Sequence, residues 1–264
     1  MPNVSPNPSG KFRLEEFHEL FSKLVQSQHS FILIGGQAVN YWAERYLPTE
    51  PELERLAPFT SADIDFLGTR KDVAELGRIT GRKPAYPSWH ELTMLAGVIP
   101  CQTDTGEASI EVVRSVPQST SEEVRATSIK AAHAGFRLEV INPVSLLRSK
   151  ADLARTVDQT HRQDVHHLRI MVICTKAFLQ EVLLAVERDE VSARDWLNIV
   201  KDLLSFTESD LGIKVARQHG IDWTVILPKL KAGKVSRASI RTFYEKRVPL
   251  WRVRVKQAQA PGPA

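Results

Sequence analysis

The stretch SADIDF, residues Ser61–Phe66, alternates polar and apolar residues, which is typical of a strand with one buried face. Asp63 and Asp65 are therefore expected to project from the same side of that strand. Two carboxylates held side by side repel each other unless a cation lies between them, and oxygen ligands suit Mg²⁺ or Mn²⁺. The stretch thus predicts a metal-binding strand, with a solvated edge strand as the alternative.

A glycine turn precedes this strand. The apolar run Phe31–Ile34 ends at Gly35 and Gly36, and an amphipathic stretch, Gln37–Tyr46, follows. Where a strand ends in a glycine turn and a helix begins, backbone N–H groups can meet a phosphate. Taken alone, a pair of glycines is more typical of an ordinary turn. The interpretation depends on the position of the glycine turn before the SADIDF strand.

In this order the two motifs resemble the signature of the nucleotidyltransferase superfamily, which has a polymerase-beta-like fold. The resemblance is strongest to the AbiEii-like nucleotidyltransferases of the abortive-infection and toxin branch. These read Gly-Gly-x-Ala and then Ser/Thr-x-Asp-Ile-Asp-Phe, and the matching residues here are Gly35–Ala38 and Ser61–Phe66. A later block, Asn142–Leu147 with Lys150 and then Arg162–Leu168, is similar to the branch's Pro-x-x-Leu-Leu-x-x-Lys and Arg/Lys-x-Asp helices.

The resemblance implies a catalytic, metal-binding set of three acids. Asp63 and Asp65 match the motif, and the third acid of the family lies on a later strand. Glu111 is the candidate for that position, with Glu107 and Asp104 as competitors. The gap from the glycine turn to Asp63 is longer than is usual in the family, and the excess around residues 47–58 is expected to be an inserted loop or short helix.

The resemblance also implies a nucleotide-binding set: Gly35, Gly36, Ser61, Lys150 and Asp164. The glycines would let the backbone approach the phosphates, and the Ser61 hydroxyl would donate to a phosphate oxygen. Lys150 would contact the triphosphate, and Asp164 would orient Lys150 or assist the acceptor. The alternatives are a strand-start role for Ser61, a surface position for Lys150 and a helix N-cap for Asp164.

These patterns predict an α/β (α+β) chain, with a small mixed nucleotidyltransferase sheet flanked by helices and then a mainly α-helical C-terminal region. The expected parts are a disordered N-terminus at 1–10, a nucleotidyltransferase core at 11–142, a helical region with a basic end at 143–256 and a disordered tail at 257–264. Helices are predicted at 12–28, 71–79, 143–157, 162–188 and 192–206, and a further strand at 136–141.

Composition excludes several classes of protein. With 42% hydrophobic and 25% charged residues, the chain is typical of a soluble globular protein. No apolar run approaches the roughly 20 residues of a membrane span, and the N-terminal residues lack a signal-peptide pattern. We therefore expect a cytoplasmic protein without a membrane partner, in which Cys101 and Cys174 are free thiols.

Positive charge is concentrated near the C-terminus. The segment Lys229–Lys256 carries ten Lys or Arg and one acid, although the whole chain has a net charge of only +4. Phe243, Tyr244 and Trp251 lie among these residues, and basic residues interleaved with aromatic ones suit RNA. The alternatives are a solvated basic helix with its aromatics packed inward, or a short edge strand at Arg252–Lys256.

Three functions remain open. The first is transfer of a nucleotide from an NTP to RNA or tRNA, in the manner of a toxin with a cognate antitoxin protein. The second is modification of a small molecule such as an aminoglycoside, which the basic segment disfavours because polycations prefer acidic pockets. The third is a non-catalytic nucleotide-binding module.

A zinc site at His161, His166 and His167 fits no standard spacing, and the sequence lacks Gly-x-Ser-x-Gly and Walker A motifs.

Overall fold

A computed structural model describes residues 11–27, 29–133, 135–230 and 236–260. The expected disordered N-terminus at 1–10 lies outside these residues, as does the second half of the expected tail, 261–264. The chain forms two compact units, one of Met1–Arg45 with Arg55–Leu146 and one of Tyr46–Glu54 with Leu147–Ala264. The 3-10 helix η2 (Pro51–Leu56) occupies the inserted segment that the sequence predicts as a loop or short helix.

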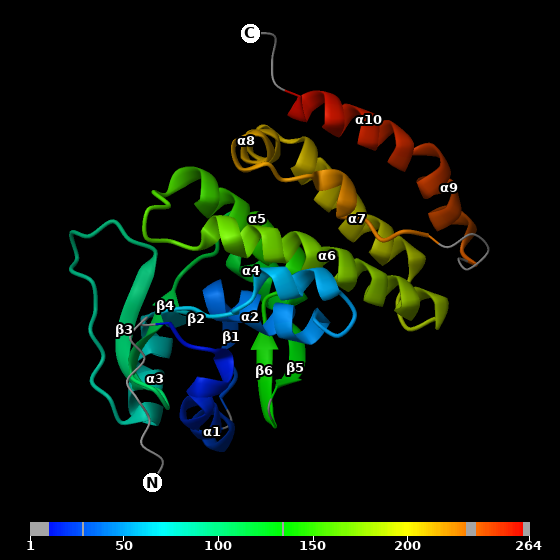
Figure 1. Cartoon of the computed structure of the whole chain (residues 1–264). Helices are drawn as coiled ribbons and strands as arrows, with labels where there is room; N and C mark the ends of the chain where they lie inside the picture. The colour runs from blue at the N-terminus through cyan, green and yellow to red at the C-terminus, as the bar shows by residue number, and fades with distance from the viewer. Residues whose placement is uncertain (1–10, 28, 134, 231–235, 261–264) are drawn as a thin grey trace. The chain divides into compact units, whose positions relative to one another are not determined.

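The first unit is built on one mixed sheet of six strands, in the order β3-β4-β2-β1-β6-β5 (Figure 1). The pairs β1–β6 and β2–β4 are parallel, and the other neighbours are antiparallel. The strands are β1 (Ile32–Ile34), β2 (Asp63–Leu67), β3 (Leu95–Gln102), β4 (Glu107–Val113), β5 (Ile129–His133) and β6 (Phe136–Val140), and the helices are η1 (Leu14–Phe17), α1 (His18–Ser27), α2 (Gly35–Tyr46), α3 (Arg70–Thr80) and α4 (Ser121–Thr127).

One face of this sheet is covered by α3. Phe66 on β2 pairs with Val112 on β4, which in turn pairs with Gly97 on β3. A Cβ added to Gly97 would lie 2.7 Å from Val73 of α3, so the helix packs against the face that carries these residues. Side chains one position away along β2 and β4 point to the opposite face. Asp63, Asp65 and Glu111 occupy those alternate positions.

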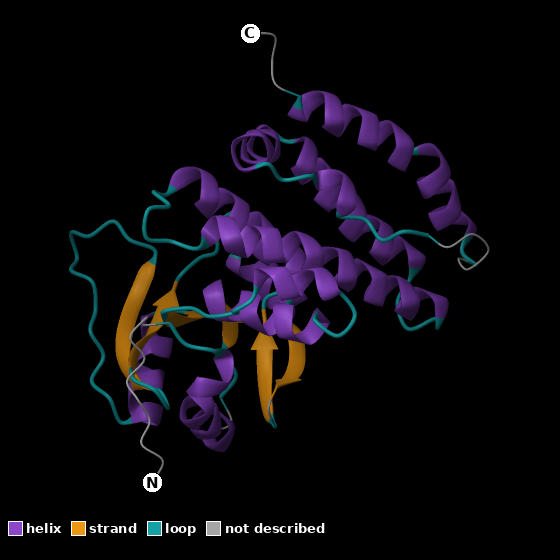
Figure 2. Ribbon diagram, viewed as in Figure 1, coloured by secondary structure: helices purple, strands orange, loops and turns teal. Residues whose placement is uncertain are grey.

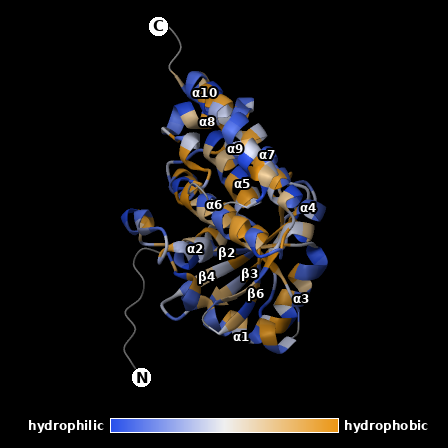
Figure 3. Cartoon of the chain, turned by 90° about the vertical axis from the view of Figure 1, so that its right-hand side faces the viewer, coloured by the Kyte–Doolittle hydropathy of each residue, from blue (hydrophilic) through white to orange (hydrophobic). Residues whose placement is uncertain are grey.

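The second unit is helical (Figure 2). Its elements are α5 (Pro143–Thr156), α6 (Asp164–Glu187), α7 (Ala193–Glu208), α8 (Asp210–His219), η3 (Trp223–Val225), α9 (Ala238–Lys246) and α10 (Val248–Gln259). With the mixed sheet of the first unit, these helices confirm the predicted fold class. Figure 3 shows that the helices carry both hydrophobic and hydrophilic residues, as amphipathic helices of a packed core do.

Three buried tryptophans organise the core of this helical unit. The indole Nε1 of Trp196 donates to the carbonyl of Leu179 at 2.9 Å. Trp223 and Trp251 donate in the same way, to the carbonyl of Gly212 at 2.9 Å and the hydroxyl of Thr207 at 3.0 Å. Each ring thus buries a large apolar surface while its one polar atom is hydrogen-bonded.

The C-terminal end differs from one expectation. Arg252–Lys256 is not an edge strand but part of α10, because Val248, Trp251 and Val255 form a buried stripe at helical spacing. The helix continues to Gln259, so the first residues of the expected tail are helical. Within the described part of the chain, no helix is long and apolar enough to cross a membrane.

Candidate active site

The register of β2 and β4 brings the three predicted acids together. Asp65 pairs with Glu111 in the parallel ladder, and Asp63 pairs with Ser109. One carboxylate oxygen from each of Asp63, Asp65 and Glu111 lies within 4.8 Å of the other two, and all three side chains are half-buried. We call this group the acidic triad.

The two competing third acids lie elsewhere. Glu107 is the exposed first residue of β4, four positions before Glu111. Asp104 precedes that strand, and its carboxylate lies 3.0 Å from Nδ1 of His18. Of the three candidates, Glu111 is therefore the one that joins Asp63 and Asp65.

Gly35 lies in close contact with Asp65 of the triad. It is the first residue of α2 and has a φ of +67°, a left-handed conformation that L side chains rarely adopt. A Cβ at this position would lie 1.8 Å from Oδ2 of Asp65, so any side chain would displace the carboxylate. Gly36 follows as the second residue of the same helix. The glycine turn that the sequence singles out thus lies directly beside the Asp-x-Asp strand.

Ser61 supports the triad from the N-terminal side of β2. Its side chain is buried, and its hydroxyl donates to Oδ1 of Asp63 at 3.2 Å. The backbone of Ser61 is fixed by a bridge to Phe12, with N···O distances of 2.8 and 2.9 Å. Ser61 therefore positions a carboxylate, and the predicted contact of its hydroxyl with a phosphate stays a prediction.

The donor set of the triad fits a hard divalent cation. All the ligand atoms are carboxylate oxygens, which Mg²⁺ and Mn²⁺ prefer over softer ligands. Three negative charges held this close repel one another, and a cation between them would offset that repulsion. The contact between Gly35 and Asp65 leaves the aspartate little freedom to move away. The acidic triad could therefore bind a metal ion.

Lys150 and Asp164 form a buried ion pair within the second unit. Nζ of Lys150 lies 3.0 Å from Oδ1 of Asp164, and Nε of Arg162 donates to the other oxygen at 2.6 Å. Burial would raise the pKa of the Asp164 carboxyl, but the charge of Lys150 and the hydrogen bond from Arg162 outweigh it, so the pKa is lowered. Asp164 is the first residue of α6 and follows the N-cap Gln163. The predicted contact of Lys150 with a triphosphate stays a prediction.

The structure brings together a second group of side chains that could bind a metal, which the sequence does not predict. Ligand atoms of Glu15, Glu44 and His133 lie within 4.8 Å of one another. Nη1 of Arg13 lies 3.6 Å from Glu15, and Nε2 of His133 lies 3.5 Å from Glu44. Burial lowers the pKa of His133 and raises that of Glu44, so it disfavours the charged form of both side chains. The members of this second group come from η1, α2 and β5, so no local motif connects them.

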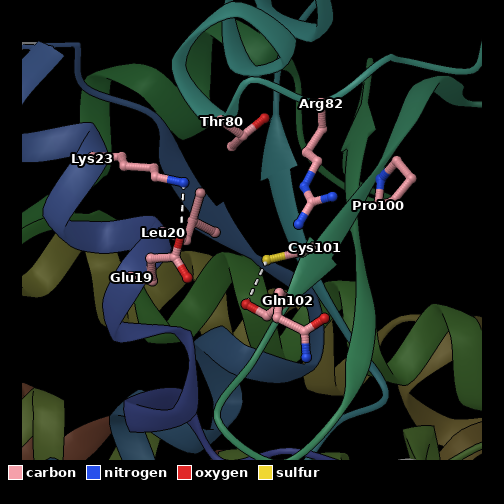
Figure 4. Close-up of a pocket in the computed structure, with 8 residues that line it drawn as sticks. All are labelled: Glu19, Leu20, Lys23, Thr80, Arg82, Pro100, Cys101 and Gln102. Atoms are coloured by element: carbon pink, nitrogen blue, oxygen red, sulfur yellow. Dashed lines mark hydrogen bonds and ion pairs between the residues drawn. The ribbon is translucent and has the colours of Figure 1, made fainter.

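A small cavity lies beside Cys101 in the first unit (Figure 4). Its volume of about 20 Å³ has room for a water molecule but not for a substrate. Glu19 accepts a hydrogen bond from Lys23 at its edge, at 2.6 Å. Burial, reinforced by the charge of Glu19, raises the pKa of Cys101 to about 11, so the thiol is protonated at neutral pH and is no nucleophile. Cys101 and Cys174 are both free thiols.

The aromatic residues of the basic segment Lys229–Lys256 belong to the core. Phe243 and Trp251 are buried, and Tyr244 stacks on Trp196 with ring centroids 6.0 Å apart. Phe243 and Trp251 are therefore not available to bases, and one face of Tyr244 is covered by Trp196. Residues 231–235 of the segment lie outside the described residues, and RNA binding by its basic side chains stays a prediction.

Two cations of this segment line a cavity of about 410 Å³ within the second unit, namely Lys229 and Arg252. Lys176 also lines the cavity, and its ammonium lies 2.7 Å from the carboxylate of Glu50.

Comparison with known proteins leaves the family open. No protein-family model matches the chain, and no curated protein is similar to it in sequence. Among solved structures, the chain is similar to an antigenic nucleotidyltransferase-like protein from Paracoccidioides brasiliensis. The TM-score is 0.45 and the sequence identity 12%, over 86% of this chain and 99% of that chain. The case for a function therefore rests on the residues of the acidic triad and their surroundings.

Proposed function

We propose that the chain is a metal-dependent nucleotidyltransferase, which moves a nucleoside monophosphate from an NTP to a hydroxyl group of an acceptor. The observation that carries the proposal is the acidic triad, with Glu111 in register with Asp65 and Gly35 in contact with the same aspartate. A structural role alone does not account for three half-buried acids gathered beside a left-handed glycine at the start of a helix.

In this proposal the acidic triad holds Mg²⁺ or Mn²⁺, which supplies the positive charge that activates the acceptor hydroxyl and stabilises the departing pyrophosphate. Ser61 keeps the Asp63 carboxylate in place through its hydrogen bond. Gly35 and Gly36 allow the backbone at the start of α2 to approach the phosphates, where the helix dipole favours negative charge. The acceptor oxygen bonds to the α-phosphorus, pyrophosphate leaves, and the hydroxyl proton passes to water.

We further propose RNA as the acceptor, with the basic side chains of the Lys229–Lys256 segment as its contacts. The excess of cations in that segment supports RNA over a polycationic small molecule. The resemblance to AbiEii-like proteins extends the proposal to a toxin with an antitoxin partner. Lys150 is assigned to the triphosphate on the same resemblance, with Asp164 as the residue that orients it.

Label transfer tests this function. The protein is incubated with each α-labelled NTP and Mg²⁺ or Mn²⁺, together with total cellular RNA, cellular protein or an aminoglycoside. We expect label on RNA, and its loss in Asp63→Asn, which preserves shape but removes the charge. Label on the small molecule instead would overturn the choice of acceptor. Failure to label any acceptor with any NTP, by protein that binds NTP normally, would favour the non-catalytic module.

A further inference from the structure

The loop between α3 and β3 carries a tryptophan of unusual exposure. Trp89 is 91% exposed, whereas the chain's other four tryptophans, Trp42, Trp196, Trp223 and Trp251, are each at most 1% exposed. Leu92 on the same loop is fully exposed as well. Large apolar side chains gathered at the surface mark an interaction site more often than chance.

The backbone around this tryptophan is tied to the sheet. Ala85 forms a bridge with Val98 of β3, with N···O distances of 2.8 and 2.9 Å. At the other end of the loop, the backbone N–H of Arg114 donates to Met94 at 2.8 Å, and its Nη1 donates to the carbonyl of Thr93 at 3.0 Å. Both ends of the loop that carries Trp89 are thus anchored to the sheet.

Arg70, the first residue of α3, contacts two aromatic rings of this loop. Its guanidinium carbon lies 4.3 Å from the ring centroid of Tyr86 and 5.6 Å from that of Trp89. These cation–π contacts hold a positive charge beside an indole whose surface remains open to solvent. We call Arg70, Tyr86 and Trp89 the aromatic platform.

The surroundings of the platform favour an anionic partner. Lys71 and Arg114 are exposed nearby on α3 and just after β4. The two acids of this region are engaged locally, since Asp72 accepts from the backbone N–H of Thr69 at 2.6 Å and Glu91 accepts from that of Ser88 at 3.2 Å. Cations around an exposed ring suit a polyanion whose unpaired bases can stack, which describes single-stranded nucleic acid.

We propose that the aromatic platform binds single-stranded RNA, with one unpaired base stacked on Trp89 and the neighbouring phosphates on Arg70 and Lys71. The choice of RNA rests on the proposed function. The inference goes beyond it, because it places a base-stacking contact on the unit that also carries the acidic triad. Of the aromatics of the basic C-terminal segment, Phe243 and Trp251 are buried and Tyr244 is stacked on Trp196, so none is as open to a base as Trp89.

Tryptophan fluorescence tests the platform, because Trp89 is the only tryptophan of the chain that a soluble quencher can reach readily. The full chain is titrated with an oligouridylate of about ten nucleotides, a length within the usual single-strand site size. EDTA is present and NTP is omitted. We expect quenching on binding and protection of Trp89 from iodide. An RNA duplex of the same length should bind much more weakly, because its bases are already stacked.

Four variants complete the test, and their affinity is measured by the fluorescence anisotropy of a dye-labelled oligouridylate, because the Trp89 variants lack the reporting residue. Trp89→Ala should weaken oligouridylate binding about tenfold, Trp89→Phe should keep most of the affinity, and Lys71→Ala should lower the salt dependence. Leu92→Ala is the matched control, since it removes an exposed apolar side chain but no ring. Unchanged binding by Trp89→Ala would overturn the proposal, and so would an equal loss in Leu92→Ala, which would indicate an apolar docking face for protein.

The assay also separates this inference from the proposed function. It contains neither NTP nor metal, so RNA binding through Trp89 can be found in a protein that transfers nothing. Conversely, label transfer to RNA that is unchanged in Trp89→Ala would uphold the transferase and reject the platform.

Discussion

Gly35 and Gly81 have nearly the same left-handed backbone but different surroundings. Their φ angles are +67° and +68°, yet a Cβ at Gly35 would strike the carboxylate of Asp65, whereas nothing lies within 4 Å of a Cβ at Gly81. Substitution at Gly81 would therefore introduce backbone strain alone, whereas substitution at Gly35 would introduce the same strain and a clash with the acidic triad. Gly81 ends α3 as its C-cap, which is a common place for a left-handed glycine.

Gly35→Ala should therefore cost more than Gly81→Ala. The strain at Gly81 should lower the free energy of unfolding by about 1 kcal/mol and leave nucleotide transfer unchanged. Gly35→Ala should add to that strain the displacement of Asp65, with transfer reduced at least about 100-fold if the triad is catalytic. Denaturant unfolding and label transfer measure the two effects. Equal activity in the two variants would contradict a requirement for glycine beside Asp65.

Glu44 gives a prediction about pH. Burial, with a further contribution from the charge of Glu15, raises the pKa of Glu44 from 4.5 to about 7. A carboxyl whose pKa is higher in the folded state favours folding while it is protonated. That contribution is complete below about pH 4.5 and is lost as the pH rises through about 7.

Glu44→Gln keeps the shape of the side chain and removes the titration. The free energy of unfolding of the variant, minus that of the original protein, should rise by about 1–3 kcal/mol from pH 4 to pH 8. Denaturant titrations at both pH values measure this gain. Glu122→Gln, at an exposed position of the same unit, is the control and should show little change. A gain of the same size in both variants would exclude burial of Glu44 as the cause.

At the scale of elements, the start of α6 is fixed to α5 by charge. Lys150 lies on α5, and Asp164 opens α6 with both carboxylate oxygens engaged. Both side chains of the Lys150–Asp164 pair are nearly inaccessible, at 6% and 2% exposure. A buried pair of this kind stabilises little relative to apolar residues, but removing one partner leaves an uncompensated charge.

Asp164→Asn should therefore lower the free energy of unfolding by about 3–5 kcal/mol. Asp202→Asn is the matched control, because Asp202 is 54% exposed and lies 3.0 Å from Arg148 of the same helix α5. That change should cost at most about 1 kcal/mol. The pKa of Asp164 is lowered from 3.8, so its contribution is present above that pH and is lost as the pH falls through the folded value. Similar costs for the two variants at pH 7 would contradict the buried pair.

At the scale of the whole molecule, the sequence predicts those features that depend on residues close together in the chain. The strand of Asp63 and Asp65, the turn at Gly35 and the helix capped by Ser192 each depend on neighbours a few residues away. In α7 the Ser192 hydroxyl accepts from the backbone N–H of Asp195 at 3.1 Å, a cap formed by residues only three positions apart. The mixed fold followed from the order of these local elements.

Long-range features were harder to predict. Glu111 joins the triad only because β4 pairs in parallel with β2, and nothing in its own segment fixes that register. The Glu15, Glu44 and His133 group and the platform of Arg70 and Trp89 depend on chain paths that periodicity does not encode. The alternative of a strand at Arg252–Lys256 is wrong. A short alternation of polar and apolar residues fits a strand or a helix, and only the packing of neighbouring elements decides between them.

Metal binding by the acidic triad can be measured without knowing the acceptor. Mn²⁺ binding is followed by electron paramagnetic resonance in the presence of a non-hydrolysable NTP analogue, for the original protein, Glu111→Gln and Glu107→Gln. Both variants change the same chemical group on the same strand, but only Glu111 belongs to the triad. We predict that Glu111→Gln weakens Mn²⁺ binding at least about tenfold, whereas Glu107→Gln binds as the original protein does. Equal Mn²⁺ binding by all three proteins would contradict a metal centre at Asp63, Asp65 and Glu111.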